Sequence, residues 1–174
     1  MTRAPALLSL LLALAGCATL DKDECRNANW TAIGLEDGAQ GRGIERVGDH
    51  RRACAEHNVQ PDLDRYTAGR NEGLKTFCTY DRGYRHGLNG NAYSGACPEP
   101  MQKDFLAGYG RGKEIHSLDK RLEEVNMEIR KTKSGLSEPG SSPRLRAMLA
   151  EKLDALSREA ADLERQLARA RSRR

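Results

Sequence analysis

Residues 30–38, with the sequence WTAIGLEDG, carry an aromatic side chain followed by two glycines spaced four apart. The pattern recurs, with the aromatic three positions before a G-x-x-x-G, in residues 66–73 (YTAGRNEG), 80–87 (YDRGYRHG) and 105–112 (FLAGYGRG). Residues four apart share a helix face, and two glycines there make a groove in which another backbone approaches closely. We therefore predict short helices that pack through Gly34, Gly38, Gly69, Gly73, Gly83, Gly87, Gly108 and Gly112.

Two other interpretations of these glycines stay open. They fit turns and helix caps, where glycine is also favoured, and they fit contacts to a ligand. A phosphate-binding loop is excluded, because the chain contains no G-x-x-x-x-G-K-[ST] and no strand-led G-x-G-x-x-G. Proline and turn residues set the expected helix bounds, with Cys97–Pro100 as a loop. Helices are expected near residues 22–40, 43–57, 61–77, 79–90 and from 102 onward.

The N-terminus predicts export and lipid anchoring. Residues 1–16 read as a signal peptide, with Arg3 before an apolar run that ends in small residues. Leu14-Ala15-Gly16-Cys17 resembles the bacterial lipobox, whose cysteine takes a diacylglyceryl group and, after cleavage, a further acyl chain such as palmitate. Two or more chains hold a protein stably on a membrane. Ala18 resembles a sorting signal for the outer membrane; the alternative is a plain secreted protein.

Export also decides the expected cysteine chemistry. With Cys17 lipidated, Cys25, Cys54, Cys78 and Cys97 remain, an even number in an oxidising compartment. Two disulfides are expected there, with three pairings open. If the first two helices form a hairpin, Cys25 lies near Cys54, which leaves Cys78 for Cys97; we favour these pairings. A metal site built on Cys54 and His57 is the less favoured alternative, so no metal or other cofactor is expected.

Composition divides the chain in two. Residues 17–112 hold all eight aromatic residues and 14 of the 17 glycines, whereas residues 113–174 hold no aromatic residue and no cysteine. We predict an all-α protein: a small disulfide-stapled domain of short Gly-rich helices, then a long helical hairpin. The whole chain has 29 basic and 25 acidic residues, and this near balance argues against a nucleic-acid partner.

The hairpin follows from apolar spacing. Large or small apolar residues recur at steps of three and four from Ile115 to Ile129 and from Leu149 to Leu167, with charged flanks, which is typical of coiled-coil seams. A Ser-, Gly- and Pro-rich loop near residues 134–143 ends the first helix. An antiparallel hairpin within one chain is expected, and pairing of two copies into a homodimer is the alternative.

Further residues support a family assignment. They are Cys25–Trp30, Ile33, Gly34, Asp37, Gly38, Arg46, His50, Cys54, Val59–Asp62, Tyr66, Gly69, Gly73, Leu74, Cys78, Gly87, Gly90, Tyr93, Gly95, Cys97, Pro98, Phe105, Gly108 and Tyr109. This combination resembles the proteobacterial lipoproteins grouped as domain of unknown function 2799, over about residues 17–112. That family has no established activity, so the resemblance implies a compartment and a domain extent but no chemistry.

No catalytic constellation stands out. His50 shares a helix face with Arg46 and Cys54, yet a histidine that bonds a carbonyl or an acid explains it better than catalysis. Asp37, Asp62 and Asp64 are expected to be cap or surface acids. We expect a lipid-anchored adaptor on the periplasmic side of the outer membrane, not an enzyme, with residues 113–174 contacting an envelope protein or the cell wall. The alternative is a binder of a small periplasmic ligand or cell-wall fragment that uses Trp30, His50, Tyr66 and Tyr93.

Overall fold

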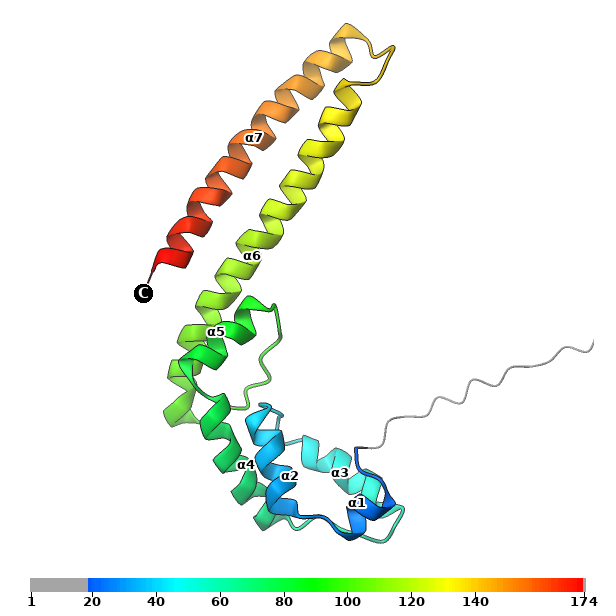
Figure 1. The fold of residues 1–174 in the computed structure, drawn as a ribbon, viewed down its shortest axis with the longest axis vertical. Coiled ribbons are helices and arrows are strands. Elements are labelled where there is room, and N and C mark those ends of the chain that lie inside the picture. Colours follow the sequence, from blue (N-terminus) through cyan, green and yellow to red (C-terminus); the bar gives the residue numbers. More distant parts are fainter. Residues whose placement is uncertain (1–18, 174) are drawn as a thin grey trace, which may run out of the picture.

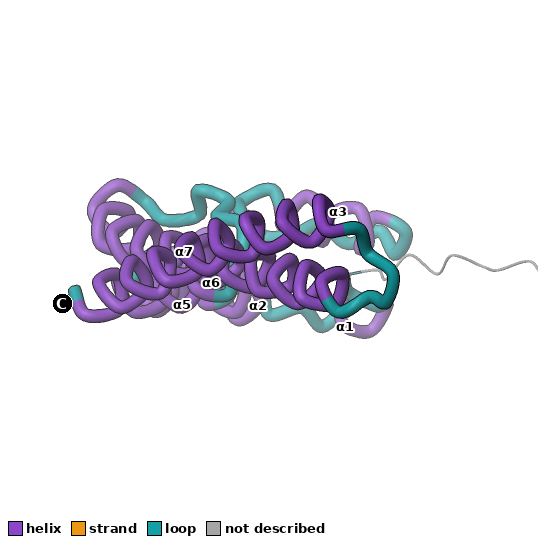
Figure 2. Tube along the Cα trace, turned by 90° about the horizontal axis from the view of Figure 1, so that it is seen from above, coloured by secondary structure: helices purple, strands orange, loops and turns teal. Residues whose placement is uncertain are grey.

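The computed structural model describes residues 19–173, and within them it contains helices and loops but no strand (Figures 1 and 2). The seven helices of this part are α1 (Lys22–Arg26), α2 (Trp30–Ala39), α3 (Arg46–Ala55), α4 (Leu63–Phe77), α5 (Tyr80–Leu88), α6 (Glu99–Leu136) and α7 (Pro143–Ser172). The predicted signal peptide and Cys17 lie outside the described residues. Across residues 19–173, every helix is either too short or too polar to span a bilayer. The predicted all-α class is confirmed.

The eight glycines of the recurring pattern lie at two helix crossings. Helix α2 packs against α4, and helix α5 packs against the first half of α6. At each crossing a glycine faces the backbone of the other helix: a Cβ built on Gly34 would lie 2.0 Å from the carbonyl oxygen of Tyr66. The same holds for Gly69 and the carbonyl oxygen of Thr31, at 1.9 Å. Only glycine allows two helix backbones to approach this closely, which explains why glycine occurs inside these helices despite its low helix propensity.

The two crossings repeat one another. Gly83 faces the carbonyl of Phe105 as Gly34 faces that of Tyr66, and the other six glycine contacts correspond in the same way. The loops after α2 and α5 also match, since each turns at a glycine with positive φ, Gly41 at 70° and Gly90 at 73°. The aromatic–glycine pattern therefore marks two copies of one supersecondary unit, each a pair of crossed helices.

A disulfide joins the segments that precede the two helices of each pair. Cys25 bonds Cys54, and Cys78 bonds Cys97, which are the pairings favoured from the sequence. The expected reason for the first pairing is wrong, because α2 forms its helix pair with α4 and not with α3. Each disulfide lies in a small core. Cys25 and Cys54 pack with Trp30 and Tyr66, and the second disulfide packs with residues that include Leu74, Phe77 and Phe105.

Two expected helix bounds need correction. The helix expected near residues 22–40 is interrupted, because Asn29 caps α2 by accepting a hydrogen bond from the backbone N–H of Ala32 (3.1 Å). Side chains of this type favour caps over helix interiors. The helix expected from residue 102 begins at Glu99, with Pro98 as its N-cap residue and Pro100 in the first turn. Proline is tolerated there because the first N–H groups of a helix have no intrahelical partner.

Helices α6 and α7 form the predicted antiparallel hairpin, joined by residues 137–142 (Figure 1). Ile115, Leu167 and Ala170 form a buried cluster at its base, and Val125, Ala160 and Leu163 form a second one further along. Helix α6 runs without a break through residue 112, so its first half belongs to the glycine crossing and its second half to the hairpin. The hairpin therefore projects from the second helix pair as a continuous arm.

Candidate functional site

A buried polar network joins three helices of the first unit. Asp37 of α2 is 7 % exposed, His50 of α3 is 3 % exposed and Tyr66 of α4 is fully buried. The Tyr66 hydroxyl donates to Asp37 Oδ2 (2.8 Å), and His50 Nε2 lies 2.8 Å from the same oxygen. Buried polar groups need such partners, because an unpaired buried donor or acceptor is costly. The network thus fixes how α2, α3 and α4 sit against one another.

Charge in the network is set by its hydrogen bonds. Burial raises the pKa of Asp37, but hydrogen bonds from His50 and Tyr66 and the nearby positive charges lower it by a larger amount. The pKa of Asp37 therefore lies below the ordinary value. Burial, together with the hydrogen bond to Asp37 and its charge, raises the pKa of Tyr66 well above that of a free phenol. Asp37 is therefore a carboxylate and Tyr66 a neutral phenol at neutral pH. Since a carboxylate only accepts, His50 Nε2 carries a hydrogen and donates it.

His50 also contacts the N-terminal end of the described chain, at Thr19. His50 Nδ1 lies 2.9 Å from Thr19 Oγ1, within hydrogen-bond distance. Leu20 packs against the core of the first disulfide, beside Trp30 and Tyr66. Thr19 and Leu20 are therefore fixed to the first unit, and Thr19 stands two residues after Cys17 in the sequence.

A hydroxyl, an imidazole and a carboxylate in line resemble the parts of a hydrolytic triad. The geometry favours a structural lock instead, because Tyr66 and His50 share one carboxylate oxygen and all three central groups are buried. Four pockets in the described part of the chain, of about 260 to 600 Å³, are lined by other residues. A catalytic group needs a place where a reacting atom can sit. What this arrangement does is to tie Thr19 to three helices.

The structure separates the four residues expected to form a ligand site. Trp30, His50 and Tyr66 lie together in and beside the core of the first unit, with the His50 and Tyr66 rings 6.1 Å apart in an edge-on arrangement. Tyr93 lies in the second unit, where its ring centroid is 4.6 Å from that of Phe105. Its hydroxyl accepts a hydrogen bond from the backbone N–H of Cys97 (3.0 Å). The four do not form one cavity wall.

Asp37 was missed by the sequence interpretation, which placed it with the surface acids. The signal was present in the spacing: Asp37 follows Trp30 by seven residues and Gly34 by three, which puts it on the buried stripe of α2. Asp62 is the expected cap, since its side chain accepts from the backbone N–H of Arg65 (3.0 Å), and Asp64 is exposed. The sulfur of Cys54 is held in the disulfide, which leaves His57 without its expected metal-binding partner.

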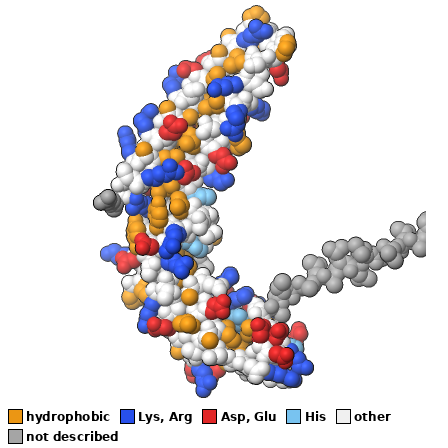
Figure 3. Space-filling model, in the orientation of Figure 1, with side chains coloured by type: hydrophobic (Ala, Val, Ile, Leu, Met, Phe, Trp, Pro, Cys, Tyr) orange, Lys and Arg blue, Asp and Glu red, His pale blue; other side chains and the backbone are white. Residues whose placement is uncertain are grey.

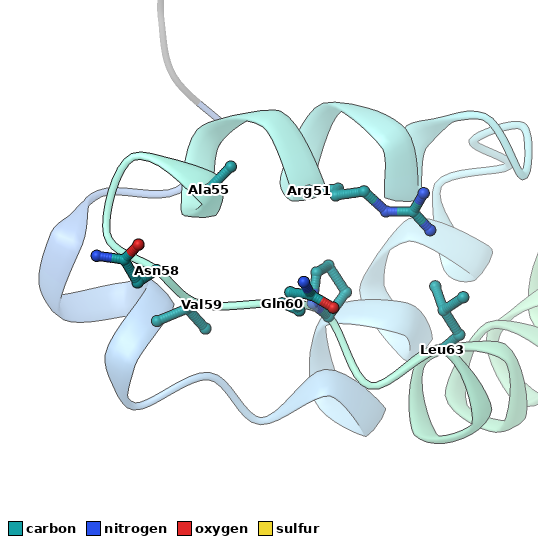
Figure 4. A pocket seen from close by; sticks show the side chains of 7 residues that line it. Arg51, Ala55, Asn58, Val59, Gln60 and Leu63 are labelled. Carbon is teal, nitrogen blue, oxygen red and sulfur yellow. The ribbon is translucent and has the colours of Figure 1, made fainter.

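A pocket of about 600 Å³ opens between α3 and the segment that leads into α4 (Figure 4). Arg51 supplies its charge, and Val59, Pro61 and Leu63 supply apolar surface. Asn58 turns the chain at its rim with a φ of 56°, a conformation that asparagine tolerates better than most residues. Arg51 is exposed, so solvent satisfies its charge without a ligand.

The fold and its cross-links define a class of protein with a duplicated unit. Each unit is a pair of helices that cross at glycines, and a disulfide joins the segments that precede its two helices. Residues 29–114 match the family model described as protein of unknown function (DUF2799), and this part of the chain belongs to that family. The match begins at the cap of α2 and ends just after Gly112, so that it spans both crossings. No curated protein sequence and no solved structure matches the chain.

Proposed function

We propose that this protein is a lipid-anchored adaptor of the bacterial cell envelope, held on the periplasmic face of the outer membrane by acyl chains on Cys17. The proposal for the anchor is supported by the lipobox-like sequence Leu14–Cys17. The hydrogen bond between Thr19 and His50 adds to it. With about 3.6 Å per residue, a lipid on Cys17 would sit within about 8 Å of the first fixed residue. The domain would then lie directly against the membrane surface rather than on a long tether.

The hairpin carries the proposal for an adaptor role. Helix α7 has 30 residues and is therefore about 45 Å long, at about 1.5 Å per residue. Beyond its base it packs only on α6 within the described residues, and its other faces are open (Figure 1). Met127, Leu145 and Met148 in the outer part of the arm are 50 %, 44 % and 61 % exposed, and hydrophobic side chains reach its far end (Figure 3). Exposed methionines are typical of surfaces that bind other proteins.

An adaptor explains the architecture better than an enzyme does. The buried groups that have catalytic chemistry hold the helices and Thr19 together, whereas α7 and the second half of α6 form an exposed arm. The partner we propose is an envelope protein or the cell wall, contacted through residues 113–174; a second copy of this chain is the competing partner. Nucleic acid is not proposed, because acidic and basic side chains alternate along the arm.

The anchor is tested by the mass of the mature protein. Intact-mass analysis of the membrane fraction is expected to show a chain that begins at Cys17 and carries acyl groups, in outer-membrane fractions of a density gradient. Cys17→Ser should release the protein into the soluble periplasm, while the neighbouring change Ala18→Ser should leave it attached. An unmodified Cys17, or a Cys17→Ser chain that stays on the membrane, contradicts the anchor.

The arm is tested by shortening it. Removing residues 126–156 and closing the chain with a Gly-Ser turn deletes the outer part of the hairpin and keeps the buried cluster of Ile115 and Leu167 at its base. This variant should remain folded and anchored, yet fail to restore any envelope defect caused by loss of the whole protein. Full restoration by the shortened chain would contradict the adaptor role.

A further inference from the structure

Arg70 is a buried cation without a carboxylate. It belongs to α4, lies between the two crossing glycines Gly69 and Gly73, and is 7 % exposed. Its guanidinium donates one hydrogen bond, to the backbone carbonyl of Arg42 (2.8 Å), and its Nε–H has no acceptor in the described part of the chain. Within residues 19–173 no acidic side chain lies within 4.0 Å of it. A buried charge is normally paired, since burying it alone is expensive.

The second helix pair shows what the fold itself requires at this position. Tyr109 of α6 corresponds to Arg70, because it follows Gly108 as Arg70 follows Gly69. Its hydroxyl donates to the backbone carbonyl of Asn91 (3.0 Å), and Asn91 follows Gly87 by four residues as Arg42 follows Gly38. A neutral phenol therefore ties the loop down in one copy of the unit. The positive charge of Arg70 is not needed for that task, so it calls for another explanation.

Arg70 lines a pocket of about 280 Å³ between the loop that leads into α3 and the loop of residues 94–98. Glu45 lines the same pocket, and no cation of the described residues lies within 4.0 Å of its carboxylate. Asn71 and Ser94 add polar groups to the wall, and Leu74 adds an apolar one. The pocket thus combines the buried, unpaired guanidinium of Arg70 with the exposed carboxylate of Glu45, and the two charges lie more than 4.0 Å apart.

We propose that this pocket binds a small zwitterion, with its carboxylate on Arg70 and its ammonium group on Glu45. α-Amino acids and short peptides share this chemistry. A guanidinium suits a carboxylate because its N–H donors match the two oxygens, and charge-assisted hydrogen bonds of this kind are among the stronger ones in proteins. Neither Arg70 nor Glu45 was singled out from the sequence, where both are simply two of many charges. The site is independent of the adaptor role of the arm.

Calorimetric titration of the full chain in detergent micelles tests the site with four probes: alanine, dialanine, acetate and methylammonium. The expected result is saturable binding of alanine or dialanine, weaker binding of acetate and none of methylammonium. Whether alanine or dialanine binds more tightly shows whether the site is for a free amino acid or for a peptide. Arg70→Lys should weaken binding about tenfold, the equivalent of about 1.4 kcal/mol, because a lysine loses the planar fork.

Two further variants keep the result decisive. Glu45 is exposed, so Glu45→Gln should fold normally, weaken the zwitterion several-fold and leave acetate unchanged. Arg51→Gln changes the arginine of the other large pocket and should alter nothing. The proposal is overturned if none of the four probes binds, if Arg70→Lys binds as tightly as the natural chain, or if Glu45→Gln has no effect on the zwitterion.

Discussion

The carbonyl oxygen of Phe105 occupies the place where a side chain on Gly83 would begin: a Cβ there would lie 2.1 Å from it. A Cβ at residue 83 is fixed in place by the backbone of α5, and the oxygen belongs to the backbone of α6, so the clash is relieved only by separating the two helices. Gly34 and Tyr66 stand in the same relation in the first unit. The crossings, more than the small cores, decide how the helices are placed.

Gly83→Ala should therefore be strongly destabilising. Overpacking in a tight interior costs about 1–3 kcal/mol, and a clash between two backbones belongs at the upper end. Gly110→Ala is the matched control, because Gly110 lies in the same crossing segment of α6 but a Cβ there meets nothing within 4 Å. This control should be neutral or gain up to about 1 kcal/mol of helix propensity. Urea unfolding followed by circular dichroism measures both; equal effects of the two variants would refute the crossing.

Each disulfide should contribute separately to stability. The bonds link residues 29 and 19 positions apart, and in the chain-entropy description closing loops of that size contributes about 3–4 kcal/mol each. We expect Cys25→Ala with Cys54→Ala, and Cys78→Ala with Cys97→Ala, to lower stability by similar amounts. Denaturant unfolding of the two double variants checks this. A double variant as stable as the natural chain would show that its unit does not need the cross-link.

Asp37 predicts a loss of stability in acid. Its pKa is lower in the folded protein than the ordinary value of 3.8, so the folded state binds its proton less readily than the unfolded state does. The contribution is therefore present above that ordinary value and is lost as the pH falls through the lower folded pKa. Asp37→Asn should destabilise the protein at pH 7, and the gap to the natural chain should narrow on acidification. Asp154→Asn, at an exposed ion pair on α7, is the control and should change little at either pH. A gap of constant size from pH 7 to pH 3 would contradict the assignment.

The Thr19 lock predicts a local effect. Thr19→Val keeps the shape of the side chain but removes the hydroxyl that is hydrogen-bonded to His50 Nδ1, which should cost about 1 kcal/mol. Hydrogen exchange should speed up at the backbone amides of the first described residues, while the α4–α2 crossing stays protected. Thr67→Val, at an exposed position of α4, should have neither effect. If exchange at the N-terminal segment is unchanged in Thr19→Val, Thr19 is not what fixes it.

The glycine spacing was enough to predict which helix faces pack closely, because a helix face follows from local periodicity. It could not predict which helices meet, since a groove at Gly34 and Gly38 fits any partner with the same spacing. The expected hairpin of the first two helices was wrong for that reason, although the disulfide pairing that it suggested agrees with the structure.

The polar groups of the molecule were harder to predict. Asp37 differs from the other acidic residues only in its contacts with His50 and Tyr66, which belong to two other helices. Arg70 differs from the other basic residues only in being buried without a nearby carboxylate. Both depend on the tertiary arrangement. The apolar seam of the hairpin, in contrast, could be predicted from Ile115 to Leu167, because heptad spacing and burial coincide there.

The adaptor role is tested most directly in living cells, with a photocrosslinking amino acid at Met148, the most exposed of the large apolar side chains in the outer arm. The control position is Thr67, which is exposed and belongs to α4 of the first helix pair, away from the tip of the arm (Figure 1). We predict one discrete adduct between Met148 and a different envelope component, absent when the photocrosslinking amino acid stands at Thr67. No adduct from Met148, or adducts only to a second copy of this chain, would contradict the role.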